Sequence, residues 1–224
     1  MKKIKAVLFD LDGTLLDSRS VWTNLDAEFL AGRGIKMPSD YPAAVSTMGF
    51  RASAEYTIQR FGLPDRPESL MREWFAMAQG LYATAVPAKK GVKAFLEKLK
   101  SQGILLGVAT ANAENLFMPC LQRNEIASLF DAFATVAETP TGKKDGQVYR
   151  LCAQKLGVEP CECAVFEDLF VGIQFAKESN FYTVGVKDAG NQAEWADILL
   201  VADECLTDFE DAPHLKLWNA LQVF

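Results

Sequence analysis

The sequence predicts an α/β protein in which a parallel sheet carries one large helical insertion. Short apolar runs typical of buried strands alternate with segments whose apolar residues recur at helical spacing, which is the pattern of βαβ units. Most connections between these segments are short. The exception is an excursion of roughly a hundred residues between the first and second apolar runs, and this length favours an inserted domain over a loop.

The apolar runs and helical patterns give the expected order of elements in the core. Strands are expected at 4–9, 104–109, 132–136, 163–166, 181–186 and 198–201. Helices are expected at 91–102, 114–125, 148–156 and 172–179. Gly103 and Gly157 follow two of these helical patterns, at the position where a glycine commonly ends a helix. The core domain is therefore expected to span 1–17 and 87–224.

The excursion itself has the pattern of an all-α domain. Helical patterns at 21–31, 52–61 and 68–83 are separated by segments that contain prolines, among them Pro38 and Pro42. We expect this inserted helical domain to span 18–86.

Composition excludes several classes of protein. The net charge is −6 with no basic block, which argues against nucleic acid or an anionic membrane as the partner. Half of the residues are hydrophobic, too many for a disordered chain. The single histidine, His214, excludes a histidine-rich zinc centre. Five irregularly spaced cysteines and the lack of a signal peptide or a membrane-spanning stretch predict reduced thiols and a cytoplasmic location.

Polar residues follow several of the predicted strands. Taken alone, each has an ordinary explanation: Asp12-Gly13 suits a hairpin turn, Thr110 a helix N-cap, Lys143-Lys144 a solvated turn, and Glu167-Asp168 a helix start. Together they would converge, because ligands bind at the carboxyl ends of parallel strands. The string 9–18 also places Asp10 and Asp12 two residues apart, then a glycine and a hydroxyl, which favours a metal and phosphate site.

These segments resemble the four motifs of the haloacid dehalogenase superfamily of phosphohydrolases. The matching residues are 10–14, the hydroxyl-containing segment 107–112, the lysine of 142–143, and 166–168 followed by 172–173. The resemblance runs from about residue 5 to 186. It implies a Rossmann-like, doubly wound parallel sheet with an inserted helical cap, and it is greatest for β-phosphoglucomutases, phosphoglycolate phosphatases and small sugar phosphatases.

The third motif departs from the pattern of that subgroup. Its lysine is commonly followed by a proline and then an aromatic residue, whereas the segment 143–149 has no proline. Counting back from Tyr149 favours Lys143 as the motif lysine, and Lys144 is the alternative.

The resemblance implies a Mg²⁺-dependent phosphatase that hydrolyses a small phosphorylated metabolite, such as a sugar phosphate, through an aspartyl-phosphate. Asp10 would be the nucleophile and Asp12 the general acid and base. Thr110 and Lys143 would stabilise the phosphoryl group. The Asp10 carboxylate, the Asp12 carbonyl and Asp168 would bind the metal.

Further residues are candidates for contacting the substrate. Ala111 and Asn112 follow Thr110, and Glu167 precedes Asp168. In the insertion, Arg51 follows Gly49 at the start of a helical pattern and could reach a second anionic group. We expect a monomer or a weak homodimer.

Two alternatives to a phosphatase are kept. A β-phosphoglucomutase is the nearer one, but mutases of the family carry a histidine soon after the first motif, and this chain has Trp22 in that region and no histidine before His214. A non-enzymatic phospho-acceptor module would need neither the large insertion nor the acid that Asp12 offers.

Overall fold

Residues 3–46, 50–140 and 144–221 are described by a computed structural model, and their contacts divide the chain into two units. Met1–Ser18 and Pro87–Phe224 form the core unit, and Arg19–Val86 form the helical unit. Within the described residues, no helix combines the length and the apolar character that crossing a membrane requires.

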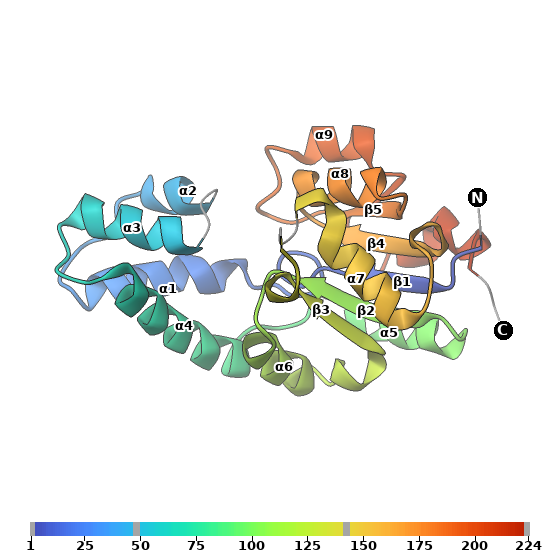
Figure 1. Cartoon of the computed structure of the whole chain (residues 1–224), viewed down its shortest axis with the longest axis horizontal. Helices are drawn as coiled ribbons and strands as arrows, with labels where there is room; N and C mark the ends of the chain where they lie inside the picture. The colour runs from blue at the N-terminus through green and yellow to red at the C-terminus, as the bar shows by residue number, and fades with distance from the viewer. Residues whose placement is uncertain (1–2, 47–49, 141–143, 222–224) are drawn as a thin grey trace. The chain divides into compact units, whose positions relative to one another are not determined.

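The core unit contains a parallel sheet, which confirms the predicted α/β fold (Figure 1). In the described residues the strand order is β3-β2-β1-β4-β5-β6, and each pair of neighbouring strands is parallel. The chain therefore winds outward from β1 to β3, returns across β1, and winds outward again to β6. The strands are β1 (Ala6–Phe9), β2 (Leu105–Thr110), β3 (Ala132–Thr135), β4 (Cys163–Glu167), β5 (Tyr182–Val186) and β6 (Glu204–Leu206).

Alternate residues of the central strand β1 pack on opposite faces of the sheet. Leu8 joins an apolar cluster with Val148 and Cys152 of α7, the helix that crosses the sheet in Figure 1. Phe9 contacts Phe95 of α5, with ring centroids 6.2 Å apart. Helices thus cover both faces. The core helices are α5 (Val92–Ser101), α6 (Glu114–Arg123), α7 (Gln147–Leu156), α8 (Phe170–Glu178) and α9 (Trp195–Val201).

Two predicted helix ends are confirmed by backbone geometry. Gly157 has φ +71° directly after α7, and Gly103 has φ +77° two residues after α5. Only glycine adopts this left-handed conformation without a steric cost to a side chain.

The strand predicted at 198–201 is wrong. These residues belong to α9, and the strand at that edge is β6, three residues further on. Ile198 is buried, but Leu199 and Leu200 are 54% and 83% exposed. A short apolar run cannot distinguish a strand from a helix, and β6 buries only Leu206, so it left no apolar run to detect.

The helical unit contains α1 (Arg19–Ala31), α2 (Tyr41–Ser46), α3 (Phe50–Phe61) and α4 (Pro67–Thr84). The helix α2 is not among the elements expected from the sequence, because Pro42 indicates a break between helical patterns. Pro42 occupies the first turn of α2, where its missing N–H leaves no intrahelical hydrogen bond unmade. Phe29 of α1 packs against Trp74 of α4, with ring centroids 5.4 Å apart.

Candidate active site

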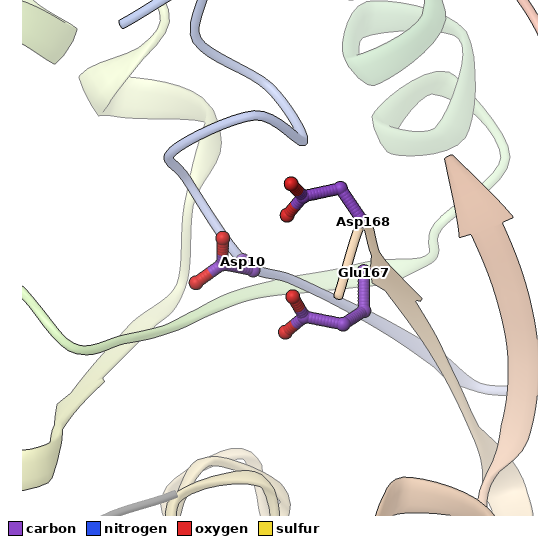
Figure 2. A group of neighbouring side chains, drawn as sticks. All are labelled: Asp10, Glu167 and Asp168. Carbon is purple, nitrogen blue, oxygen red and sulfur yellow. The ribbon is translucent and has the colours of Figure 1, made fainter. Parts of the chain in front are cut away.

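Three buried carboxyl groups lie together at the carboxyl ends of β1 and β4. One carboxylate oxygen each from Asp10, Glu167 and Asp168 lies within 4.8 Å of the other two. Asp10 is 3% exposed, Glu167 0% and Asp168 2%. Figure 2 shows the three side chains extending toward the same side of the two strand ends. The structure therefore brings together two of the residues that the sequence predicts for a metal, and adds Glu167.

The register of the sheet explains this convergence. Phe9 is paired with Val108 of β2 and with Phe166 of β4. Asp10 continues β1 by one residue, and its N–H donates to the Phe166 carbonyl at 3.0 Å. The order in which strands are added to the sheet also reverses at β1, and ligands bind at such a point in open parallel sheets.

Glu167 is held by donors from the protein itself. The Tyr149 hydroxyl donates to Oε2 at 2.6 Å, and the N–H of Leu169 donates to Oε1 at 3.1 Å. A Cβ added to Gly172 would lie 2.7 Å from the Glu167 Cδ, so this carboxyl group packs directly on the α8 backbone. The sequence drew attention to Tyr149 only as the aromatic residue of the third motif, and it gave no signal for this contact.

The segment 11–16 forms a closed loop after β1. The Leu11 carbonyl accepts the N–H groups of Thr14, Leu15 and Leu16 at 2.8–3.2 Å, and Gly13 donates to the Leu16 carbonyl at 3.0 Å. Because successive amides meet at one carbonyl, the loop is tight and holds Asp12 directly beyond the end of β1. The turn expected at Asp12-Gly13 is thus part of the site.

This loop packs on Asp168. Gly13 has φ +80°, and an added Cβ would lie 2.8 Å from the Asp168 Cγ and nearer still to Oδ2. The buried Thr14 hydroxyl donates to the Asp168 Oδ1 at 3.2 Å. Glycine at 13 is therefore required both by the backbone conformation and by the close approach of Asp168.

The loop after β2 reaches Asp12. The Asn112 amide nitrogen donates to the Asp12 Oδ2, and the Asn112 N–H donates to the Thr110 Oγ1 at 3.2 Å. Thr110 is 1% exposed at the end of β2, with Ala111 exposed between it and Asn112. Asn112, considered above for the substrate, therefore orients the Asp12 carboxyl group, while the Thr110 hydroxyl keeps its own proton for another acceptor.

The oxygen atoms of this site are suitable ligands for Mg²⁺. Mg²⁺ prefers oxygen ligands, and the cluster offers the carboxylates of Asp10, Glu167 and Asp168. Three ionised carboxyl groups this close and this buried repel one another, so a bound cation would stabilise them.

The structure does not test two of the predicted contributors. Lys143 lies outside the described residues, and only the backbone of Lys144 is described, at the start of the turn Lys144–Gly146. Arg51 belongs to the helical unit, where its guanidinium pairs with Glu68 at 2.6 Å and with Glu55 at 3.3 Å. Which lysine serves the third motif, and what Arg51 binds, stay predictions.

The described cysteines carry no disulfide. Burial raises the pKa of the Cys120 thiol to about 11, and the charge of Asp12 adds to this shift. Burial also raises the pKa of Cys152 and of Cys163 to about 12. These thiols are therefore protonated near neutral pH and act as packing groups.

A family profile matches most of the chain. The haloacid dehalogenase-like hydrolases match residues 4–180, a stretch that includes every residue of the carboxylate cluster and the whole helical unit.

Individual proteins are similar over nearly the same length. Hexitol phosphatase B of Escherichia coli K12 is 31% identical over 83% of this chain and 84% of its own length. Validoxylamine A 7′-phosphate phosphatase of Streptomyces hygroscopicus subsp. limoneus is 28% identical over 94% and 98%. Among solved structures, a β-phosphoglucomutase from Clostridium difficile matches with a TM-score of 0.75, 18% identity, and coverage of 96% and 97%. At that identity the structural match supports the fold alone.

Proposed function

The chain belongs to the haloacid dehalogenase-like hydrolase family, and from this premise we propose that it is a Mg²⁺-dependent phosphatase of a small phosphorylated metabolite. Hydrolysis of phosphomonoesters agrees with the activities for which its relatives are named. The observation that carries the proposal is the buried carboxylate cluster, with the Asp12 carboxyl group oriented beside it by Asn112.

The substrate phosphate would bind among Asp10, Thr110 and the motif lysine. The Asp10 and Asp168 carboxylates and the Asp12 carbonyl would hold Mg²⁺, which when bound offsets the repulsion between the Asp10 carboxylate and the phosphate dianion. The Thr110 hydroxyl would donate a hydrogen bond to a phosphoryl oxygen, and the motif lysine, Lys143 or alternatively Lys144, would supply positive charge to the others.

In the first step, a carboxylate oxygen of Asp10 attacks phosphorus in line with the leaving oxygen. A new bond forms between Asp10 and phosphorus as the bond to the substrate alkoxide breaks. Asp12, protonated at this stage, gives its proton to the alkoxide, and the alcohol leaves. Asn112 fixes the Asp12 carboxyl group for this transfer.

In the second step, the ionised Asp12 takes a proton from water, and the water oxygen attacks the phosphorus of the aspartyl-phosphate. The bond between Asp10 and phosphorus breaks, phosphate leaves, and both aspartates return to their starting states. One carboxyl group thus serves as acid and then as base.

The names of the relatives support a proposal for the substrate class. Hexitol phosphatase B is named for a hexitol, which is a polyol, and the Streptomyces relative is named for validoxylamine A 7′-phosphate. We propose a sugar phosphate or polyol phosphate as substrate. A screen of such compounds with and without Mg²⁺, with release of phosphate as the readout, identifies the one this chain prefers.

The variant Asp10→Asn tests the mechanism. Asparagine keeps the size of the side chain but removes the nucleophile, so we expect the variant to fold and to lose Mg²⁺-dependent phosphate release. Exposed Asp197 on α9 gives the matched control, because Asp197→Asn makes the same chemical change far along the sequence from the cluster and should keep full activity. Appreciable Mg²⁺-dependent phosphatase activity in Asp10→Asn would overturn the proposal.

A β-phosphoglucomutase is the second candidate. The described helical unit has Trp22 one turn into α1, with its ring centroid 6.1 Å from that of Tyr82, in the region where family mutases carry a histidine. This favours hydrolysis. Incubation with a hexose 1-phosphate separates the two: free phosphate supports the phosphatase, and hexose 6-phosphate formed only with a bisphosphate primer supports the mutase.

A phospho-acceptor without turnover is the third candidate. It predicts an aspartyl-phosphate at Asp10 that persists for hours, whereas the phosphatase predicts one that hydrolyses within the catalytic cycle. Acid quenching during turnover traps the aspartyl-phosphate. Samples quenched at intervals after the substrate is exhausted then give its lifetime, which distinguishes the two candidates.

A further inference from the structure

Lys89 follows the helical unit closely in the chain, and its ammonium group contacts the active-site loop. It donates to the Gly13 carbonyl, donates to the Lys187 carbonyl at 3.1 Å, and pairs with the Asp188 Oδ2 at 2.9 Å. An ammonium group has three protons, so these contacts use its whole donor capacity. The side chain is 17% exposed, and that of Asp188 is 5% exposed.

The same group of contacts continues to Asp168. The Asp188 N–H donates to the Asn191 Oδ1 at 3.1 Å. The Asn191 amide nitrogen donates to the carbonyls of Asp168 and Val186, each at 2.8 Å, and Asn191 is 1% exposed. Asp188 and Asn191 follow β5, so the end of a third strand supports the loops that carry Asp12 and Asp168.

Gly13 offers only its main chain for positioning Asp12. It has no side chain, and its left-handed φ of +80° is strained for any other residue, so Gly13 itself cannot anchor the loop through a side chain. Lys89 holds the Gly13 carbonyl, one residue after Asp12, and the main-chain N–H of Lys89 donates to the Leu15 carbonyl at 2.8 Å. The loop is thus fixed from the segment that returns from the helical unit.

The charge of Lys89 does not explain its place. Its ammonium is matched by the Asp188 carboxylate, so the pair adds no net charge to the site. A largely buried ion pair is also weak support for stability, because desolvation of both charges offsets their attraction. The contact with the Gly13 carbonyl is therefore the feature that best accounts for the position of Lys89.

From these contacts we propose that Lys89 is a positioning residue for proton transfer: it fixes the Gly13 carbonyl and thereby the Asp12 carboxyl group at the leaving oxygen. This rests on the phosphatase activity proposed above. Without Lys89, the loop would still form, but Asp12 would be less well aligned to protonate an alkoxide.

The test compares two leaving groups in the variant Lys89→Met, which keeps the length of the aliphatic stem. The leaving group of a hexitol phosphate is an alkoxide, which needs a proton. The leaving group of p-nitrophenyl phosphate is p-nitrophenolate, which is stable without one. The ratio kcat/KM reports the first step alone. General acid catalysis contributes about 10²- to 10⁴-fold, and misalignment of Asp12 should remove only part of this. We therefore expect kcat/KM for the hexitol phosphate to fall about 10- to 100-fold, and that for the aryl phosphate to fall less than about threefold.

Controls separate positioning from a loss of structure. Lys90→Met removes the neighbouring ion pair between Lys90 and Glu210, which does not involve the 11–16 loop. This variant should keep the wild-type kcat/KM for both substrates. Asp12→Asn should show the same selectivity more strongly, and adding Lys89→Met to it should cause no further loss for the hexitol phosphate. If Lys89→Met fails to fold, the double variant Lys89→Met/Asp188→Asn can replace it, because it leaves no unpaired buried charge. We expect the same selective loss of kcat/KM for the hexitol phosphate in this double variant.

The outcomes are distinct. Equal loss for both leaving groups, no loss for either, or a further loss when Lys89→Met is added to Asp12→Asn overturns the role of Lys89 and leaves the phosphatase intact. A wild-type enzyme that hydrolyses neither compound, nor any phosphomonoester of the screen, overturns the proposed function and this inference with it.

Discussion

Replacing Gly13 by alanine tests the packing of the 11–16 loop against Asp168. Two costs apply. A side chain in the left-handed region costs about 1–2 kcal/mol, and the new Cβ would lie 2.8 Å from the Asp168 Cγ, so that this carboxyl group must move. A misplacement of about 1 Å in a catalytic group can cost about 100-fold in rate. We therefore expect Gly13→Ala to lose both stability and about 100-fold in kcat.

Gly157 supplies a matched control for the backbone cost. It has φ +71° and no atom within 4 Å of an added Cβ. Gly157→Ala should therefore be destabilised by about 1–2 kcal/mol, or about 2–8 °C in Tm for a chain of this size, with activity unchanged. Thermal unfolding followed by circular dichroism and Mg²⁺-dependent phosphate release measure the two effects. A folded Gly13→Ala with wild-type kcat would refute the reasoning.

Two further predictions concern stability. Burial raises the pKa of Asp26 from 3.8 to about 6, so the folded protein binds more protons than the unfolded chain in that window, and the free energy of unfolding should fall as pH rises through it. The free energy of unfolding, measured with urea at about pH 4 and at about pH 7, should therefore differ less between the two pH values in Asp26→Asn than in the wild type. An equal difference in the two proteins would contradict a raised pKa of Asp26. A Cβ added to Gly107 would lie 2.9 Å from the Leu8 Cδ2 and nearer to the Cys152 Sγ. Overpacking of this kind should destabilise Gly107→Ala by about 1–3 kcal/mol in the same urea assay, and wild-type stability would show that the core can adjust.

Much of the fold could be predicted because burial on both faces of a parallel sheet leaves continuous apolar runs. The error at the sheet edge has the same physical origin. The edge strand β6 buries one residue and left no run, whereas the apolar run 198–201 is a helix that exposes Leu199 and Leu200. The helix α2 was hidden by Pro42, which marks a break inside a helix but is tolerated in its first turn.

The cluster could be predicted in part because strand ends are visible in a sequence. Asp10 and Asp168 each follow an apolar run, and the topology of a parallel sheet brings such ends together. The supporting contacts had no such signal. The contact of Tyr149 with Glu167, and those of Lys89 with Gly13 and Asp188, join segments far apart in the chain and depend on side-chain paths that no local pattern records.

The two points where the chain leaves and re-enters the core unit are adjacent. The Asp17 N–H donates to the Pro87 carbonyl at 3.0 Å, and Leu16 forms an antiparallel bridge with Ala88. Relative to a four-residue turn, the insertion Arg19–Val86 is longer by about four doublings, which adds only about 2.5 kcal/mol of loop-closure entropy. The insertion is therefore a module that evolution can lengthen, shorten or exchange at little cost to the folding of the sheet, so that its helices can change while the carboxylate cluster of the core unit stays as it is.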